Sequence, residues 1–129
     1  MKIVKTTGAP EAIGPYSQGV VAGDLLFTAG QIPLDPDTNE MVEDEIHEQV
    51  SQVMLNLANV LAAAGADFSN VVKATVYLKD LNHFAAMNTV YAEFMGDNKP
   101  ARACIQAAKL PFDCMVEIDM IAKVNREHF

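Results

Sequence analysis

The sequence predicts an α+β fold in which a mixed six-stranded sheet carries two helices on one face. Two segments repeat apolar residues every three or four positions, as amphipathic helices do. Six shorter segments have the apolar or alternating character of strands, in the order three strands, helix, strand, helix, two strands. With 129 residues and 50% hydrophobic content, residues 1–129 suffice for one domain with a core and are too few for two.

The six expected strands are short and are separated by turn-forming residues. They cover residues 2–6, 20–22, 25–29 and 71–79 and the two halves of the segment 100–122. Gly23 and Asp24 lie between the second and third strands and favour a tight hairpin turn, because this pair tolerates positive φ. The segments 9–18 and 31–41 contain prolines and other turn formers and are expected to be loops.

The stronger helix signal lies between Ile46 and Ala64. Its apolar stripe consists of Ile46, Val50, Val53, Met54, Leu57, Val60, Leu61 and Ala64. Acidic residues lie in the first turn, where they suit the helix dipole, and Gly65 follows as a stop signal.

The second helix is expected to begin at Asn82, whose side chain is a good N-cap, and to end near Gly96. Its buried stripe would contain Phe84, Met87, Tyr91 and Phe94.

Composition argues against several classes of function. The net charge is −8, with acidic residues concentrated in 40–48 and basic residues scattered. A protein that grips phosphate backbones needs a basic face, so the charge argues against a nucleic-acid partner. No apolar run approaches the ~20 residues that span a bilayer, and the first residues lack a signal-peptide pattern. The two cysteines form no disulfide framework, so we expect a cytoplasmic protein.

The most informative segment is residues 100–122, PARACIQAAKLPFDCMVEIDMIA. It has the pattern of two strands joined by a proline-containing turn, so we expect an antiparallel hairpin. Strand alternation in that hairpin would place four side chains on one face: Arg102 opposite Asp119 and Cys104 opposite Glu117. A guanidinium beside a carboxylate on rigid strands can hold a small carboxylic acid and activate a water next to it.

Each of these residues also has a simpler interpretation. Arg102 could be a surface cation and Glu117 an acid on a solvated face. Cys104 is better read as an inert thiol lining a pocket than as a nucleophile, because no histidine is placed to be its base. The histidines and cysteines also lack metal-ligand spacing, and no glycine-rich phosphate loop precedes a helix. We therefore expect neither a metal nor a cofactor.

The sheet face away from the helices is expected to mix polar and apolar residues. Such a face is too apolar for water and too polar for a sealed core. A second copy of the chain would resolve this conflict, and a cyclic homo-oligomer is the commonest arrangement. A site on this face would then lie between subunits.

Four segments resemble the RidA/YjgF family of enamine/imine deaminases over nearly the whole chain: GPYSQG, AGQIPLDP, NVVKATVYLKDLNHFAAMN and PARACIQAAKLP followed by VEIDMIA. The resemblance implies a chorismate-mutase-like fold and a homotrimer with sites between subunits. It implies hydrolysis of 2-aminoacrylate (2-iminopropanoate) and 2-iminobutanoate to 2-oxo acids and ammonia, without a cofactor. Pyridoxal-phosphate-dependent dehydratases would release these substrates.

The resemblance also assigns roles to individual residues. Arg102 matches the arginine that binds the substrate carboxylate, and Glu117 matches the acid that positions water and handles protons. Cys104 matches the residue whose backbone carbonyl helps to hold that water. The substrate-binding residues implied in the same way are Tyr16 as an aromatic wall, Gly30 beside the ligand, and Asn88 near the pocket.

One position departs from the family pattern. Many active members carry serine just before the Gly-Gln pair, where this chain has Ala29. The change removes one hydroxyl hydrogen bond, and it keeps two other functions open: a regulatory protein that binds small carboxylates without turnover, and a ribonuclease or translation inhibitor, as attributed to members of this family. The acidic balance counts against the last.

Overall fold

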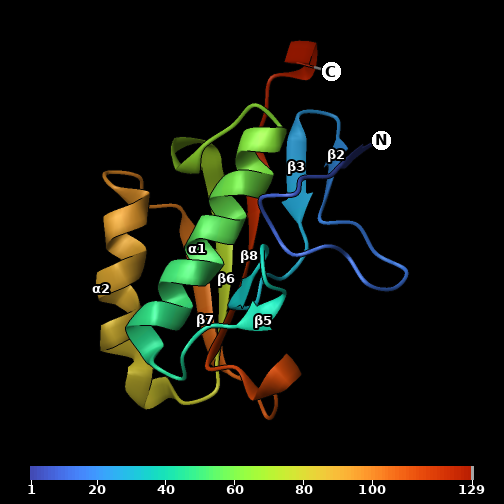
Figure 1. The fold of residues 1–129 in the computed structure, drawn as a ribbon. Helices are drawn as coiled ribbons and strands as arrows, with labels where there is room; N and C mark the ends of the chain where they lie inside the picture. Colours follow the sequence, from blue (N-terminus) through green and yellow to red (C-terminus); the bar gives the residue numbers. More distant parts are fainter. Residues whose placement is uncertain (129) are drawn as a thin grey trace.

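In the computed structural model, which describes residues 1–128, two helices cover one face of a mixed six-stranded sheet (Figure 1). The strands follow the spatial order β1-β2-β3-β8-β6-β7. Their bounds are β1 Lys2–Val4, β2 Gly19–Ala22, β3 Leu25–Thr28, β6 Val71–Leu78, β7 Ala101–Gln106 and β8 Val116–Lys123. The predicted α+β architecture is confirmed.

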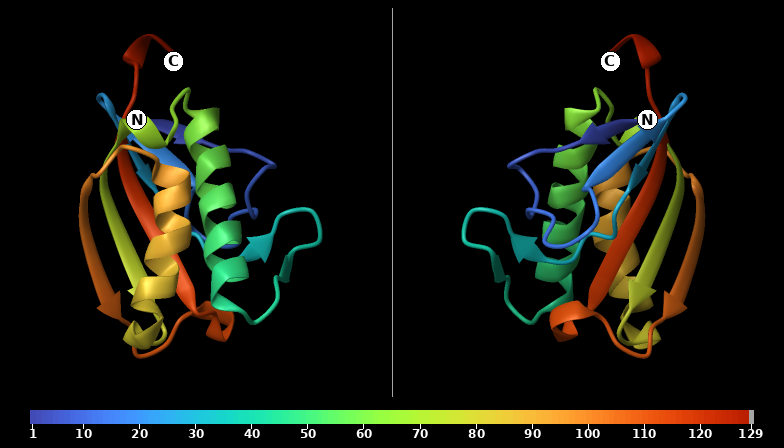
Figure 2. Two further views of the ribbon diagram at one scale, coloured as in Figure 1. Left: turned by 90° about the vertical axis from the view of Figure 1, so that its left-hand side faces the viewer. Right: turned by 90° about the vertical axis from the view of Figure 1, so that its right-hand side faces the viewer.

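The molecule has one layer of helices and one layer of strands. The helices are α1, Ile46–Ala63, and α2, Phe84–Met95. Figure 2 shows both helices on the same side of the sheet, with no element covering the opposite face. The core lies between the layers, where the apolar stripe of α1 packs on the inward residues of the central strands β6 and β8. No helix of residues 1–128 is both long enough and apolar enough to cross a membrane.

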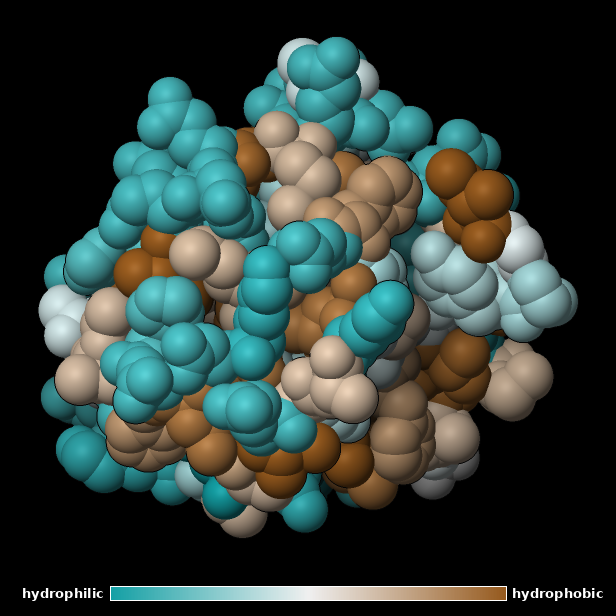
Figure 3. Space-filling view, turned by 90° about the horizontal axis from the view of Figure 1, so that it is seen from below, coloured by the Kyte–Doolittle hydropathy of each residue, from teal (hydrophilic) through white to brown (hydrophobic). Residues whose placement is uncertain are grey.

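The uncovered face of the sheet, called the open face below, is a mixture of apolar and polar side chains. Strand alternation places Phe27 and Ile105 on it, because the neighbouring Leu26 faces the core and Ile105 is paired with Tyr77. The two apolar side chains are 42% and 49% exposed. Hydrophobic residues also reach the surface in patches at the end of the molecule seen from below (Figure 3). The predicted mixed character of the open face is therefore present.

Helix α1 begins and ends where its sequence predicts, within one residue. Glu45 is its N-cap, and the Glu45 carboxylate accepts a hydrogen bond of 2.8 Å from the Glu48 amide. The ring of His47 lies 2.6 Å from the same carboxylate. At the other end Gly65 has φ of 74°, a left-handed conformation that glycine adopts without strain.

The segment predicted to be a loop at 31–41 contains a small hairpin instead. Strands β4 (Leu34–Asp35) and β5 (Glu40–Met41) pair in antiparallel register. Asn39, at φ of 62°, supplies the left-handed turn residue. Two-residue strands are too short to show an alternating pattern, so no periodicity indicated them.

The predicted start of α2 is wrong. Asn82 lies inside a single 3₁₀ turn, η2 (Leu81–His83), and its amide donates to the Asp80 side chain at 2.8 Å. Asp80 therefore caps this turn, and α2 follows from Phe84 without a side-chain cap. Asp and Asn are comparable N-caps, and the sequence places one two residues before the other, so pattern alone chose the wrong one.

The predicted hairpin of the two closing strands is also wrong. Strand β7 pairs in parallel with β6, and β8 pairs antiparallel with β6 on its other side, so β6 separates β7 from β8. The reason is the crossover through α2, which brings the chain back parallel to β6 as helix crossovers do. Residues 107–115 then carry it past the end of β6.

The Glu45 cap predicts a pH-dependent contribution to stability. Its contacts with His47 and the Glu48 amide lower the pKa of the Glu45 carboxyl from 4.5 to about 2 in the folded chain. A lowered folded pKa stabilises the fold fully above the unfolded value, and this contribution is lost as pH falls from about 4.5 towards 2. The melting temperature of Glu45→Gln should therefore lie below that of the wild type at pH 6 and converge with it near pH 2.

Glu93→Gln, on the exposed surface of α2, is the control and should leave the difference from wild type constant with pH. Parallel melting curves of wild type and Glu45→Gln at every pH would contradict the role of the cap.

Candidate active site

The central position of β6 decides which face each predicted site residue occupies. Arg102 is level with Ala74 of β6 and Met120 of β8, both buried beneath the helices. Cys104 is likewise level with residues that face the core. Glu117 is paired with Tyr77, on the open face. The prediction of a single face is thus wrong: Arg102 and Cys104 face the helices, and Glu117 points the other way.

Arg102 lies at the edge of the helix layer, against α2. Its guanidinium carbon is 4.9 Å from the centre of the Tyr91 ring and 5.5 Å from the centre of the Phe84 ring. Cation–π contacts of this kind contribute about 0.5–2 kcal/mol and fix the plane of the guanidinium. Helical spacing places Asn88 between the two rings on the same stripe of α2. Among residues 1–128, no carboxylate forms an ion pair with Arg102.

The backbone of Cys104 faces the free edge of the sheet. The Ala107 amide donates to the Leu78 carbonyl at 2.9 Å, continuing the parallel ladder between β6 and β7. In such a ladder alternate residues bond to the neighbouring strand, so the odd-numbered residues of β7 bond to β6. The amide and carbonyl groups of Arg102 and Cys104 therefore point away from β6, where a ligand can reach them.

Glu117 and Gly30 are held together by the backbone. Gln31 and Ile118 exchange two hydrogen bonds, of 2.8 and 3.1 Å, in an antiparallel bridge, which holds the segment that carries Gly30 beside β8. A Cβ added at Gly30 would overlap the Glu117 carboxylate and lie 2.9 Å from its Cδ. A side chain at position 30 would therefore have to displace the Glu117 carboxylate, and glycine allows the close approach that its position in the sequence suggested. Ala29 is tied to the preceding loop, since its amide donates to the Gln18 carbonyl at 2.9 Å.

The Glu117 carboxyl is partly buried and lies near a second carboxyl, that of Asp119. Partial burial raises its pKa, and the nearby negative charge of Asp119 raises it further. No cation forms an ion pair with Glu117 within residues 1–128. Both effects make the Glu117 carboxyl a stronger base than an exposed glutamate.

One site residue was not predicted. Tyr77 of β6 lies directly across from Glu117, and its hydroxyl donates to the Asp119 carboxylate at 3.1 Å. The signal was present in the alternation of Lys73, Thr75 and Tyr77, which places these side chains on the open face. It could not be used without knowing that β6 and β8 are neighbours.

Tyr16 lies on the loop between β1 and β2, apart from both groups. Its side chain is 56% exposed. It lines an open groove of about 690 Å³ together with Ser17, Gln18 and residues of β1, and this groove includes neither Arg102 nor Glu117. Within one chain the structure therefore brings together Gly30 with Glu117, and Arg102 with the Asn88 stripe, and leaves Tyr16 separate.

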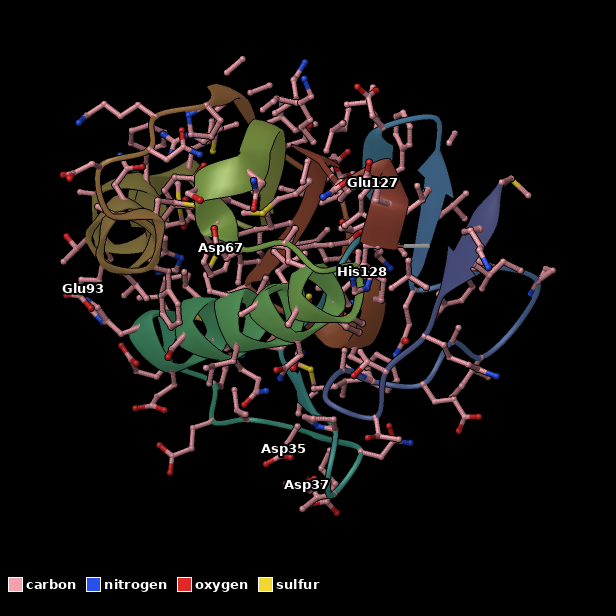
Figure 4. The ribbon with its side chains drawn as sticks, turned by 90° about the horizontal axis from the view of Figure 1, so that it is seen from above. Asp35, Asp37, Asp67, Glu93, Glu127 and His128 are labelled. Atoms are coloured by element: carbon pink, nitrogen blue, oxygen red, sulfur yellow. The ribbon has the colours of Figure 1, made fainter. Side chains whose placement is uncertain are left out.

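Residues that could bind a metal do not cluster. No group of three histidine, cysteine, aspartate or glutamate side chains within residues 1–128 has a metal-binding arrangement. Figure 4 shows Asp35 and Asp37 on the β4–β5 hairpin, well separated from Asp67 and Glu127 at another side of the molecule.

Both cysteines are free, and neither has the environment of a nucleophile. Burial raises the pKa of Cys104, partly offset by the charge of Arg102. Cys114 is fully buried, and its pKa rises from 9.0 to about 11, chiefly through burial. The interpretation of Cys104 as an inert thiol is consistent with these values.

Thiol reactivity should follow burial. At pH 8 the raised pKa of Cys114, about 11 against 9.0, lowers its thiolate fraction about a hundredfold. The native protein should therefore react with a disulfide reagent in two phases, a faster one from Cys104 and a slower one from Cys114. Cys114 should react at least a hundredfold more slowly in the native protein than in the protein unfolded in guanidinium chloride. In Cys104→Ser only the slow phase should remain. Equal rates in the native and unfolded protein would refute this account.

Comparison with known proteins gives matches along nearly the whole chain. The family model described as Endoribonuclease L-PSP matches residues 6–124. A RutC family protein of Pyrococcus horikoshii is 50% identical over 121 residues, covering 94% of this chain and 96% of that protein. A 2-iminobutanoate/2-iminopropanoate deaminase of Capra hircus is 45% identical over 121 residues, covering 94% of this chain and 88% of that protein.

Solved structures agree with this similarity. The crystal structure of E. coli TdcF with bound serine has a TM-score of 0.92 and 41% sequence identity to this chain. The match covers 97% of this chain and all of TdcF.

Proposed function

Because this chain belongs to the RidA/YjgF family, which the Endoribonuclease L-PSP model describes, we propose that it is an enamine/imine deaminase. Its substrates would be 2-aminoacrylate and its imine tautomer 2-iminopropanoate, together with 2-iminobutanoate. The products would be 2-oxo acids and ammonia. The deaminase of Capra hircus, named for the same two imines, supports this assignment.

One observation carries the proposal: the chain holds an arginine and a glutamate, each partly buried and each without a counter-ion among residues 1–128. Charges are rarely withdrawn from water without a partner, because desolvation costs several kcal/mol per ion. Arg102 is stacked on two aromatic rings and presents a fork of donors that fits a carboxylate. The serine bound to TdcF carries such a carboxylate.

Arg102 and Glu117 lie on opposite faces of the sheet, so a site that uses both needs two copies of the chain. We propose that Glu117 and Gly30 of one subunit meet Arg102, Asn88 and the Cys104 carbonyl of a neighbour. The open face supports this arrangement, because its apolar residues would be covered by the neighbour. A homotrimer, the assembly implied by the resemblance, would repeat the contact three times by rotation.

The proposed chemistry needs no strong nucleophile. Arg102 binds the carboxylate of the imine and orients C2. The imine enters in its protonated form, and Glu117 takes a proton from a water molecule as the water oxygen bonds to C2, which gives a carbinolamine. Glu117 then passes that proton to the amine nitrogen. As the C–N bond breaks, the hydroxyl proton moves to Glu117 and the C2 carbonyl forms, so ammonia leaves with a 2-oxo acid as the other product. The raised pKa of Glu117 suits both transfers.

The first test generates 2-aminoacrylate with a serine dehydratase and follows pyruvate formation. The wild-type protein should accelerate it above the spontaneous rate. Arg102→Ala should lower kcat/KM about 100-fold or more, because a bidentate charged contact is lost, and Glu117→Gln should lower kcat about 100-fold or more. Lys99→Ala, an exposed cation just before β7, is the control and should be fully active. Equal pyruvate rates with and without the wild-type protein would falsify the deaminase proposal.

The shared site has its own test. Arg102→Ala and Glu117→Gln chains, each inactive alone, are mixed, unfolded and refolded together. If each site takes Arg102 from one subunit and Glu117 from its neighbour, about a quarter of the sites in random assemblies regain both residues. Activity should return to about that fraction of wild type. No recovery, with assembly confirmed by light scattering, would place both residues of a site in the same chain.

Position 29 offers a gain-of-function test. Ala29→Ser restores the hydroxyl that many family members carry beside Gly30. One additional hydrogen bond is worth about 1 kcal/mol, so KM should fall about fivefold with little change in kcat. Ala29→Val adds bulk without a hydroxyl and should not improve KM. A KM unchanged by the serine would show that this position makes no contact with the substrate.

A non-catalytic, carboxylate-binding regulatory role is the second candidate, and the absence of a hydroxyl at Ala29 favours it. It predicts that serine or a 2-oxo acid binds and is lost with Arg102→Ala, while the dehydratase assay shows no acceleration. The description of the family model as an endoribonuclease makes RNA cleavage worth measuring in the same preparations. Cleavage unaffected by Arg102→Ala and Glu117→Gln would point to a different site or a contaminant.

A further inference from the structure

Tyr77, Thr75 and Asp119 form a hydrogen-bonded group on the open face, beside the proposed catalytic Glu117. Tyr77 of β6 is directly paired with Glu117 of β8, and its hydroxyl reaches along the sheet to the next outward residue of β8. There it donates to Asp119 Oδ2 at 3.1 Å. A tyrosine that only packed on the sheet would leave its hydroxyl in water. The Tyr77 hydroxyl instead holds the Asp119 carboxylate close to that of Glu117.

The pKa of the Asp119 carboxyl is raised, chiefly by burial, while hydrogen bonds from the Tyr77 and Thr75 hydroxyls and the charge of Lys73 oppose this rise. Thr75 is paired directly with Asp119, and Lys73 is the preceding outward-facing residue of β6. Asp119 therefore has donors for its oxygens, which Glu117 lacks.

The side chains around Glu117 are uncharged apart from Asp119. On the β6 side Glu117 faces the Tyr77 ring, and beyond it β7 contributes the apolar Ile105. On the other side Gly30 has no side chain. No cation of residues 1–128 forms an ion pair with Glu117, and Lys73 is associated with Asp119. Like charges on one face of a strand, in a partly desolvated site, raise the affinity of the less stabilised group for a proton.

We propose that Asp119, held by Tyr77, is a positioning residue that keeps Glu117 able to carry a proton near neutral pH. This inference rests on the proposed deaminase function, in which Glu117 must donate a proton to the leaving amine. Asp119 does not touch the substrate in this account. Its fixed negative charge makes protonation of Glu117 easier, and Tyr77 prevents Asp119 from taking that proton itself.

The direct test measures the proton on Glu117 without using activity. The carboxyl carbon of Glu117 is followed by NMR in ¹³C-glutamate-labelled protein, assigned by its loss in Glu117→Gln, and titrated with pH. Asp119→Asn should lower the midpoint of Glu117, because the like charge is removed. Asp119→Glu restores a charge and should keep the midpoint closer to wild type. Asp37→Asn, at the exposed tip of the β4–β5 hairpin, is the matched control and should not shift it.

Tyr77→Phe separates the role of the hydroxyl from that of the ring. Asp119 then loses a donor and should titrate at higher pH, so the two carboxyls should titrate together in a broader transition. If Glu117 has the same midpoint in Asp119→Asn as in Asp37→Asn, the inference is wrong. If the NMR spectrum shows that Asp119→Asn is unfolded, the titrations of Tyr77→Phe and Asp119→Glu decide the question instead.

The pH profile of the reaction connects this result with catalysis. In Asp119→Asn the acidic limb of the kcat profile should move to lower pH and kcat at neutral pH should fall several-fold, with KM little changed. If the wild-type protein has no deaminase activity, the proposed function is wrong. The NMR titration still shows whether the charge of Asp119 raises the pKa of Glu117. If activity is present and neither the profile nor the midpoint moves, only the inference about Asp119 fails.

Discussion

The position of β6 between β7 and β8 is the constraint on which the rest of the structure depends. Its parallel pairing with β7 and antiparallel pairing with β8 fix which side chains are level with one another. Because paired residues point to the same face, Arg102 joins the helix layer and Glu117 joins the open face. The two charged groups of the proposed site are thus separated by the thickness of the sheet, and one chain cannot bring them together. The proposal of a site shared between subunits follows from this geometry and from the resemblance to the family.

The electrostatic arrangement is unusual for an acidic protein with a net charge of −8. Its three ion pairs among residues 1–128 include neither Arg102 nor Glu117. Each of these two groups instead rests on uncharged neighbours: aromatic rings for the arginine, a glycine and a tyrosine ring for the glutamate. Charges left in this state are available to a ligand or to a neighbouring subunit. In the proposed reaction the arginine would orient the substrate and the glutamate would transfer protons, which is all that hydrolysis of a reactive imine needs.

Long periodic segments were predictable because many residues contribute to one signal. The stripe of α1 and the stop at Gly65 were correct within one residue, and the match to known structures confirms the YjgF α+β fold. Short elements were not predictable. The β4–β5 hairpin offers two residues per strand, and the cap before α2 depended on a choice between Asp80 and Asn82. Tertiary packing resolved both, and no local pattern distinguishes the alternatives.

The sequence by itself determined the family, the order of the elements and the identities of Arg102, Glu117, Gly30 and Cys104 as site candidates. Alternation along a strand also determined which residues share a face within that strand. Only the tertiary structure decided which face that is relative to the other strands, because alternation carries no information about the partner across the ladder. The assumed hairpin placed Arg102 beside Asp119, whereas the structure pairs Tyr77 with Glu117 and moves Arg102 onto α2. Strand partners are set by the packing of the whole chain, in particular by the α2 crossover.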